Sequence, residues 1–121
     1  MRIDVVPVGD VPAKVKRETS TALRSVYDAD VSVLPDREIP SGSYDANRDQ
    51  YSAEAFIDLA ADVGRAEKAI ALTTEDLYYR RRNYVFGLAY LDGRSCVVST
   101  HRLQTSSDGG FSERSAADIF A

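Results

Sequence analysis

Cys96 and His101 are the residues that most directly suggest catalysis, because a thiol and an imidazole can form a nucleophile and its base. They are the only cysteine and the only histidine in the sequence. Both fall in one expected strand, five residues apart, and an odd separation places two side chains on opposite faces of a sheet. The spacing therefore predicts a buried cysteine and a surface histidine, with a thiol hydrolase as the third-ranked function.

Asp45, Asn47 and Asp49 have the spacing of the first ligands in a calcium-binding EF-hand loop. Such a loop needs glycine at its sixth position and glutamate at its twelfth, where this chain has Gln50 and Phe56. Without the sharp turn and the bidentate carboxylate the loop cannot surround calcium. We expect instead a solvated acidic loop in which Asp or Asn side chains bond to the nearby backbone.

Two further segments could bind anions. Arginines occupy positions 80–82 beside Tyr78 and Tyr79, a combination that suits single-stranded nucleic acid. Adjacent residues cannot all face one way, and the net charge of −4 disfavours a nucleic-acid partner, so a solvated surface run is predicted. The glycine-bearing segment 106–110 lacks the lysine of a phosphate-binding P-loop and is predicted to be a connector.

The elements that position these residues begin with a short strand over residues 3–8, followed by a helix with Asp10 as its N-cap and Pro12 in its first turn. The helical spacing gives this helix one apolar face. That face comprises Val15, Ala22, Leu23, Val26 and Tyr27. A second strand is predicted over residues 31–34, and the Pro-, Ser-, Gly- and Asp-rich residues 35–50 are predicted to be a loop.

The second helix has the clearest periodicity, with Phe56, Leu59, Ala60 and Val63 on one face and Gly64 at its end. Residues 69–72 follow as a mostly apolar strand, which is typical of a central position in a sheet.

Two more strands are predicted over residues 84–91 and 95–103, joined by Asp92-Gly93, a strong signal for a two-residue hairpin. The order is strand–helix–strand–helix–strand–strand–strand. Helical crossovers favour parallel pairing of the first three strands, and the hairpin adds an antiparallel pair. The predicted fold is therefore α/β, with one five-stranded mixed sheet in a single domain over residues 1–121.

Composition narrows the class of protein further. The sequence has 44% hydrophobic and 28% charged residues, typical of a globular domain, and no apolar run that could span a membrane. The N-terminal residues contain no long apolar segment of the kind found in signal peptides. A single cysteine fits a reducing compartment. These observations predict a cytoplasmic protein with no membrane partner.

Three segments together resemble the archaemetzincins, archaeal zinc-dependent peptidases of the metzincin group. They are RIDVVPVGDVP near the N-terminus, TTEDLYYRRR, and the hairpin NYVFGLAYLDGRSCVVSTHRL. The resemblance runs in order through essentially the whole chain. It implies a catalytic module with a five-stranded mixed sheet, a backing helix and an active-site helix.

The resemblance also implies a substrate site. In metzincins an antiparallel edge strand borders the cleft and pairs with a substrate peptide. The matching strand here is residues 84–91. The predicted substrate-binding residues, which would form the rim of the cleft, are Phe86, Gly87, Leu88, Ala89 and Tyr90. A bound peptide would explain why Gly87 and Ala89 are small; the alternative is a tight fit against a neighbouring helix.

One departure from the family is large. The family holds catalytic zinc with H-E-x-x-H-x-x-G-x-x-H and carries a cysteine-rich structural zinc site, and neither occurs in these 121 residues. We therefore expect the N-terminal, substrate-binding part of a metalloprotease, truncated before its active-site helix. It would lack catalytic residues, zinc and peptidase activity, and it could self-associate through an uncovered sheet face. The alternative is a non-enzymatic peptide- or protein-binding module, or a pseudoenzyme.

Overall fold

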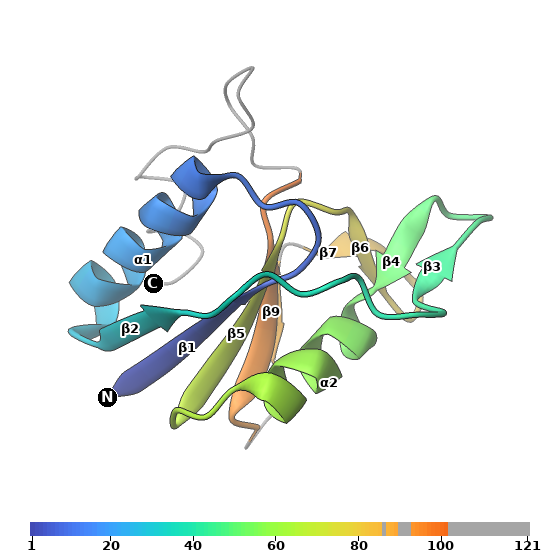
Figure 1. The fold of residues 1–121 in the computed structure, drawn as a ribbon. Coiled ribbons are helices and arrows are strands. Elements are labelled where there is room, and N and C mark those ends of the chain that lie inside the picture. The colour runs from blue at the N-terminus through green and yellow to red at the C-terminus, as the bar shows by residue number, and fades with distance from the viewer. Residues whose placement is uncertain (86, 90–92, 102–121) are drawn as a thin grey trace.

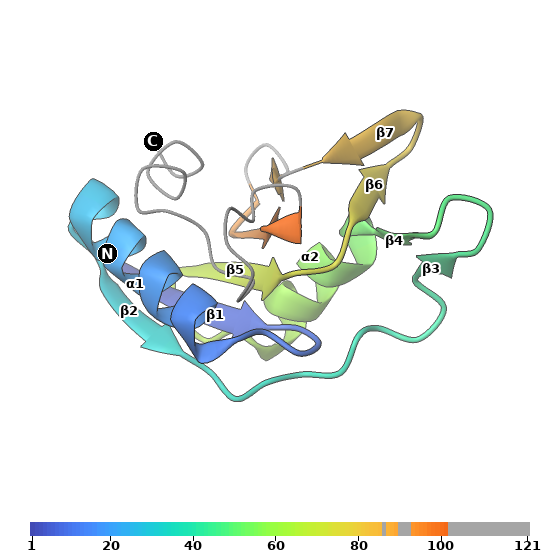
Figure 2. The ribbon, with the colours of Figure 1, turned by 90° about the horizontal axis from the view of Figure 1, so that it is seen from above.

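The computed structural model describes residues 1–85, 87–89 and 93–101 of the chain. Its main feature is a five-stranded sheet with a helix on each face (Figures 1 and 2). Across the sheet the strands are β2 (Asp30–Val33), β1 (Arg2–Pro7), β5 (Lys68–Thr73), β9 (Ser95–Ser99) and β8 (Gly87–Ala89).

The sheet is mixed, as predicted. The first four strands in this order are parallel to one another, and β8 joins β9 in antiparallel orientation at the edge. The apolar strand β5 lies at the centre. β8 and β9 follow each other along the chain, as a hairpin requires, although the expected turn residue Asp92 lies outside the described residues. The five-stranded mixed sheet and its antiparallel edge are therefore confirmed.

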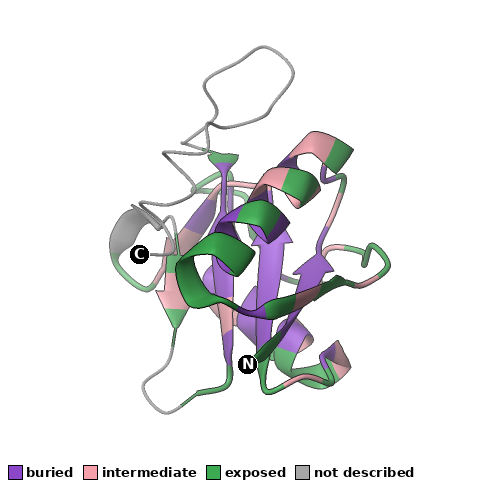
Figure 3. Ribbon diagram, turned by 90° about the vertical axis from the view of Figure 1, so that its left-hand side faces the viewer, coloured by how far each residue is buried: buried purple, intermediate pink, exposed green. Residues whose placement is uncertain are grey.

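Helix α1 (Ala13–Tyr27) covers one face of the sheet and helix α2 (Ala53–Val63) covers the other. Side chains alternate along each strand, so Val5 packs with the α1 side and Val6 with the α2 side. Buried residues are accordingly concentrated on the inner strands (Figure 3). No helix in the described part of the chain is long and apolar enough to cross a membrane.

Helix α1 differs in two details from its prediction. Its N-cap is Pro12 and no side chain caps it, because Asp10 lies too far before the first helical residue, Ala13. The buried stripe ends at Leu23. Val26 and Tyr27 are 36% and 43% exposed, because they occupy the last turn, where the chain leaves the helix through left-handed Asp28.

Helix α2 is confirmed, and Gly64 caps its C-terminus. The reason for this glycine is not the left-handed conformation common at helix ends, since its φ is −73°. A Cβ atom on Gly64 would lie 2.6 Å from the Cβ of Ala69 and 2.9 Å from the carbonyl oxygen of Ala60. Glycine therefore lets the end of α2 turn directly into β5.

A second, four-stranded sheet was not predicted. Its strands in spatial order are β3 (Tyr44–Asp45), β4 (Gln50–Ser52), β6 (Leu77–Tyr79) and β7 (Arg82–Val85). The prediction of an unbroken loop over residues 35–50 is wrong because β3 and β4 form an antiparallel pair there.

The prediction of one strand over residues 84–91 is also wrong. β7 pairs with β6 in the small sheet, and β8 pairs with β9 in the large one. The strand predicted over residues 95–103 ends at Ser99. There the Ser99 hydroxyl donates to the Glu75 carbonyl at 2.5 Å and accepts from the His101 N–H at 3.2 Å, which turns the chain. The connector predicted at 106–110 lies outside the described residues.

Candidate functional site

The edge strand β8 is the element that the sequence singled out for substrate binding. Its register with β9 pairs Gly87 with Val98 and Ala89 with Cys96. Within the described part of the chain, β9 is its only strand neighbour. One edge of β8 is therefore not paired with any described strand, and a sheet edge of this kind can pair with another chain.

The side chains of β8 fix its orientation. Leu88 is half-buried and packs on the apolar cluster beneath α2, whereas Gly87 and Ala89 are exposed. Phe86 and Tyr90, the other two predicted rim residues, lie outside the described residues. The strand is thus anchored by one apolar side chain and presents small residues on its other face.

Gly87 has a structural reason to be glycine. A Cβ atom there would lie 3.2 Å from the carbonyl oxygen of Val97 and 3.8 Å from the Cγ2 of Val98. The first distance is tighter than ordinary van der Waals contact. The close neighbour is therefore strand β9, and not a helix as the alternative interpretation expected.

Cys96 is half-buried and packs against the apolar cluster on the α1 side of the sheet. Burial raises the pKa of its thiol to about 11, and the nearby charge of Lys68 offsets only part of this. The thiol is therefore protonated at neutral pH, when it is a poor nucleophile.

His101 lies just beyond β9 and not within it, which corrects the prediction that it belongs to that strand. Its side chain is exposed, as predicted, and Nδ1 is 3.1 Å from the carbonyl oxygen of Thr74. The chain turns at Ser99 between the two residues, and the Cys96 thiol packs in the apolar cluster on the α1 side. The structure does not bring the thiol and the imidazole together, which argues against a thiol hydrolase.

The acidic loop behaves as the sequence predicted. One carboxylate oxygen of Asp45 accepts from the backbone N–H groups of Asn47 and Arg48, at 2.9 and 3.2 Å. Asp49 accepts from the Tyr44 hydroxyl at 2.6 Å, and this bond is the main cause of a raised Tyr44 pKa. Among the described residues, no group of three or more His, Cys, Asp or Glu could hold a metal ion.

Two residues of the arginine run lie on the surface, as expected. Arg80 and Arg81 are exposed, and the Arg80 guanidinium lies 5.0 Å from the centre of the Tyr79 ring. Arg48, from the acidic loop, stacks on Tyr78 at 4.5 Å and donates to the Arg80 carbonyl at 2.7 Å. These contacts hold the β6–β7 turn against the loop before β4.

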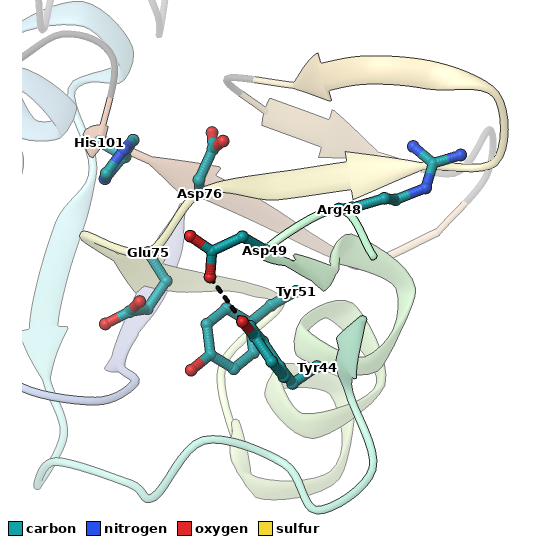
Figure 4. A pocket seen from close by; sticks show the side chains of 7 residues that line it. All are labelled: Tyr44, Arg48, Asp49, Tyr51, Glu75, Asp76 and His101. Carbon is teal, nitrogen blue, oxygen red and sulfur yellow. Dashed lines mark hydrogen bonds between the residues drawn. The ribbon is translucent and has the colours of Figure 1, made fainter. Parts of the chain in front are cut away.

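A polar pocket of about 400 Å³, not predicted from the sequence, lies where β5 and β9 end beside the small sheet (Figure 4). Tyr44, Asp49 and Tyr51 line it from the β3–β4 hairpin. Glu75 and Asp76 follow β5, and His101 follows β9. Three separate chain segments build this pocket, so no local spacing in the sequence could have revealed it.

The comparisons with known proteins agree with this architecture. No family model matches the chain. The archaemetzincin of Natronomonas pharaonis is 67% identical over 121 residues, which are 100% of this chain and 70% of that protein. A crystal structure of archaemetzincin from Archaeoglobus fulgidus complexed with malonate has a TM-score of 0.76 at 28% identity, covering 89% of this chain and 66% of that one.

A third relative is a crystal structure described as a zinc-dependent peptidase, from Methanocorpusculum labreanum. It has a TM-score of 0.71 at 28% identity and covers 95% of this chain and 72% of that one. The shared sequence extends through both sheets and helices, and high identity covers more than two thirds of the Natronomonas protein. This chain therefore belongs to the archaemetzincin family.

Proposed function

We propose that these 121 residues form the substrate-binding sheet of a zinc-dependent metalloprotease. In this proposal an extended peptide pairs with the edge strand β8. The observation that carries it is that β8, in a chain of this family, has one edge that no described strand pairs with. The family is zinc-dependent, and the relative from Methanocorpusculum labreanum is described as a zinc-dependent peptidase. The chain spans about 70% of the length of its Natronomonas relative.

The chemistry of β8 supports this role. A peptide added to a sheet edge gains affinity from main-chain hydrogen bonds, and pockets for alternate side chains give specificity. Exposed Gly87 and Ala89 leave room for a second backbone, and Leu88 anchors the strand from the other face. The strand is therefore held in an extended form before any peptide arrives, which lowers the entropic cost of binding.

The residues present do not fit the family's catalytic zinc. A catalytic zinc site uses three protein ligands and a water. The chain has one histidine and one cysteine, and the raised pKa of Cys96 disfavours the thiolate that a metal requires. We therefore propose that these residues bind peptide and do not hydrolyse it, and no step of hydrolysis is assigned to them.

Backbone amide NMR tests the peptide-binding proposal directly. A blocked peptide of alternating alanine and valine should protect the amides of Gly87, Leu88 or Ala89 from hydrogen exchange. The matched control is the same peptide N-methylated at alternate residues, which cannot complete the ladder. The opposite edge strand, β2, serves as an internal control. Protection of β2 alone, or equal effects of both peptides, would contradict the proposal.

The second candidate is a non-enzymatic peptide- or protein-binding module or pseudoenzyme, which would use the same edge of β8, the one that no described strand pairs with. The genomic DNA immediately after the codon for Ala121 separates the two candidates. A frame encoding H-E-x-x-H there, even displaced by a frameshift, favours the peptidase. A stop codon with no such motif favours the module.

We also make proposals about the cellular location of the protein and its self-association. We propose a cytoplasmic location, because a lone cysteine suits a reducing compartment. We also propose that the sheet face bearing Cys96 supports self-association, since Cys96 is only half-buried there. Sedimentation across a range of concentrations tests this, and a monomer at every concentration would exclude it.

A further inference from the structure

We propose that the pocket between the two sheets binds the basic side chain, lysine or arginine, of a peptide. The proposal depends on the proposed function only in that a peptide carries this cation. The pocket is lined by two tyrosine rings and three carboxylates, and its volume is about 400 Å³. Aromatic faces and carboxylates both favour an organic cation.

The aromatic wall is formed by Tyr44 and Tyr51, whose ring centres are 5.1 Å apart. The Tyr44 hydroxyl donates to Asp49 at 2.6 Å, and Tyr51 packs edge-on against buried Phe56 at 6.2 Å. These contacts hold both rings in place without a ligand. A cation entering the pocket would therefore meet a preformed wall (Figure 4).

The opposite side of the pocket is acidic. Asp76 accepts from the Gln50 side-chain amide at 3.0 Å, which orients its carboxylate. Glu75 is half-buried, and its backbone bonds to Thr73 and Ser99. Within the described part of the chain, no hydrogen bond or ion pair engages the Glu75 carboxylate. A half-buried anion of this kind is stabilised by an arriving positive charge.

Among the described residues that line the pocket, Arg48 is the only lysine or arginine. Its guanidinium stacks on Tyr78 and donates to the Arg80 carbonyl, away from Glu75 and Asp76 (Figure 4). Its carboxylate partner is Asp45, at 3.9 Å, which does not line the pocket. The arginine therefore closes one side of the pocket, and the Glu75 carboxylate lies on the other side.

The size of the pocket favours an organic cation over a metal ion. The described acidic residues and His101 form no cluster that could coordinate a metal. A volume of about 400 Å³ is far larger than a bare ion needs, and it suits an alkyl-ammonium or guanidinium group.

The pocket also lies at the correct end of the large sheet. β8 runs antiparallel to β9, so Gly87 at its start sits opposite Val98 near the end of β9. His101, which lines the pocket, follows β9 directly. A peptide paired with β8 would thus have one end near this pocket.

Titrations with blocked amino acid amides test the pocket separately from β8, because a single residue cannot form a strand. Acetyl-arginine amide and acetyl-lysine amide should shift the amide signals of Tyr44, Tyr51, Glu75 and Asp76. Acetyl-norleucine amide, similar in length but uncharged, should bind at least about tenfold more weakly. Raising the KCl concentration to about 1 M should weaken the charged probes, because the attraction is electrostatic.

Matched variants complete the test. Glu75→Gln should weaken arginine binding by about threefold or more, because one carboxylate of the pocket is lost. Glu67→Gln removes the same charge from an exposed position elsewhere and should leave binding unchanged. The amide NMR spectrum of each variant shows whether that variant has folded.

Equal binding of norleucine, an equal effect of both variants, or competition by magnesium at the same signals would overturn the proposal. The strand-forming peptide used for β8 gives an independent result. If that peptide fails to protect β8 while the arginine amide still binds, the peptide-pairing proposal fails and the cation pocket stands. If the peptide protects β8 but the arginine amide does not bind, only the cation-pocket proposal fails.

Discussion

At the scale of single residues, Cys96 shows how burial decides chemistry. The sequence offered one thiol and one imidazole, a pair that could catalyse acyl transfer. The structure packs the thiol against an apolar cluster and places His101 past the end of the same strand. Burial favours the neutral thiol, so the reactive thiolate is scarce at neutral pH.

The raised pKa of Cys96 predicts a pH-dependent stability. The unfolded thiol ionises near pH 9 and the folded thiol near pH 11. The stabilisation is therefore complete below about pH 9 and is lost as the pH rises through about 11, a change on the order of 3 kcal/mol. Denaturant unfolding of the wild type and Cys96→Ala should show a difference that shrinks across this window. A constant difference would contradict the prediction, as would rapid alkylation of the folded thiol at neutral pH.

Asp4 carries a second residue-scale prediction. It is a buried carboxylate on β1, and its Oδ2 accepts from the backbone N–H groups of Arg65 and Ala66 at 2.7 and 2.9 Å. Asp4→Ala should lower the free energy of unfolding by about 2–4 kcal/mol, because it leaves two donors unsatisfied. Asp4→Asn keeps an acceptor oxygen and should cost clearly less. Equal losses in the two variants would show that these hydrogen bonds contribute little.

At the scale of elements, the long helices and inner strands were predictable and the short strands were not. α2 has a clear apolar periodicity and β5 has an unbroken apolar run, because each element packs in the core along most of its length. β7 and β8 have three or four residues each, and the sequence around them reads as one strand. Their division between two sheets depends on pairing with β6 and β9, which local sequence does not encode.

The junction between α2 and β5 gives an element-scale prediction. Gly64→Ala should destabilise the fold by about 1–3 kcal/mol, because the new Cβ would lie 2.6 Å from that of Ala69. The double variant Gly64→Ala with Ala69→Gly removes that contact and should recover part of the loss. Recovery should be incomplete, since the Ala60 carbonyl is also close, at 2.9 Å.

Thermal or denaturant unfolding of the two single variants and the double variant forms a double-mutant cycle. A favourable coupling between positions 64 and 69 supports the steric explanation. Simple additivity would mean that Gly64 is needed for another reason.

At the scale of the whole molecule, the proposed peptide-binding strand belongs to a chain whose described residues form no group that could hold a metal ion. The polar pocket lies where β9 stops, and Gly87, the first residue of β8, pairs with Val98 near that end. The one histidine and the one cysteine lie apart, at opposite ends of the β9 region. We therefore predict that recognition of a peptide can be measured on these residues without hydrolysis.

Metal analysis tests this prediction. After dialysis against zinc and then against buffer, the purified 121-residue chain should retain far less than one zinc per molecule, because a stable site needs three protein ligands. His101→Ala should not change the amount retained, and it is the matched control for weak surface binding. One zinc per chain, lost on substitution of His101, would contradict the prediction and assign that histidine a metal-binding role.

The sequence by itself determined the two helices, the apolar inner strands and the antiparallel edge, because each leaves a periodic pattern or a turn signal in neighbouring residues. Its resemblance to the archaemetzincins directed attention to Gly87, Leu88 and Ala89. Only the tertiary structure decided that β7 and β8 belong to two different sheets. It alone assembled the pocket, because Tyr44, Glu75 and His101 are distant in the chain and meet only where three elements end together.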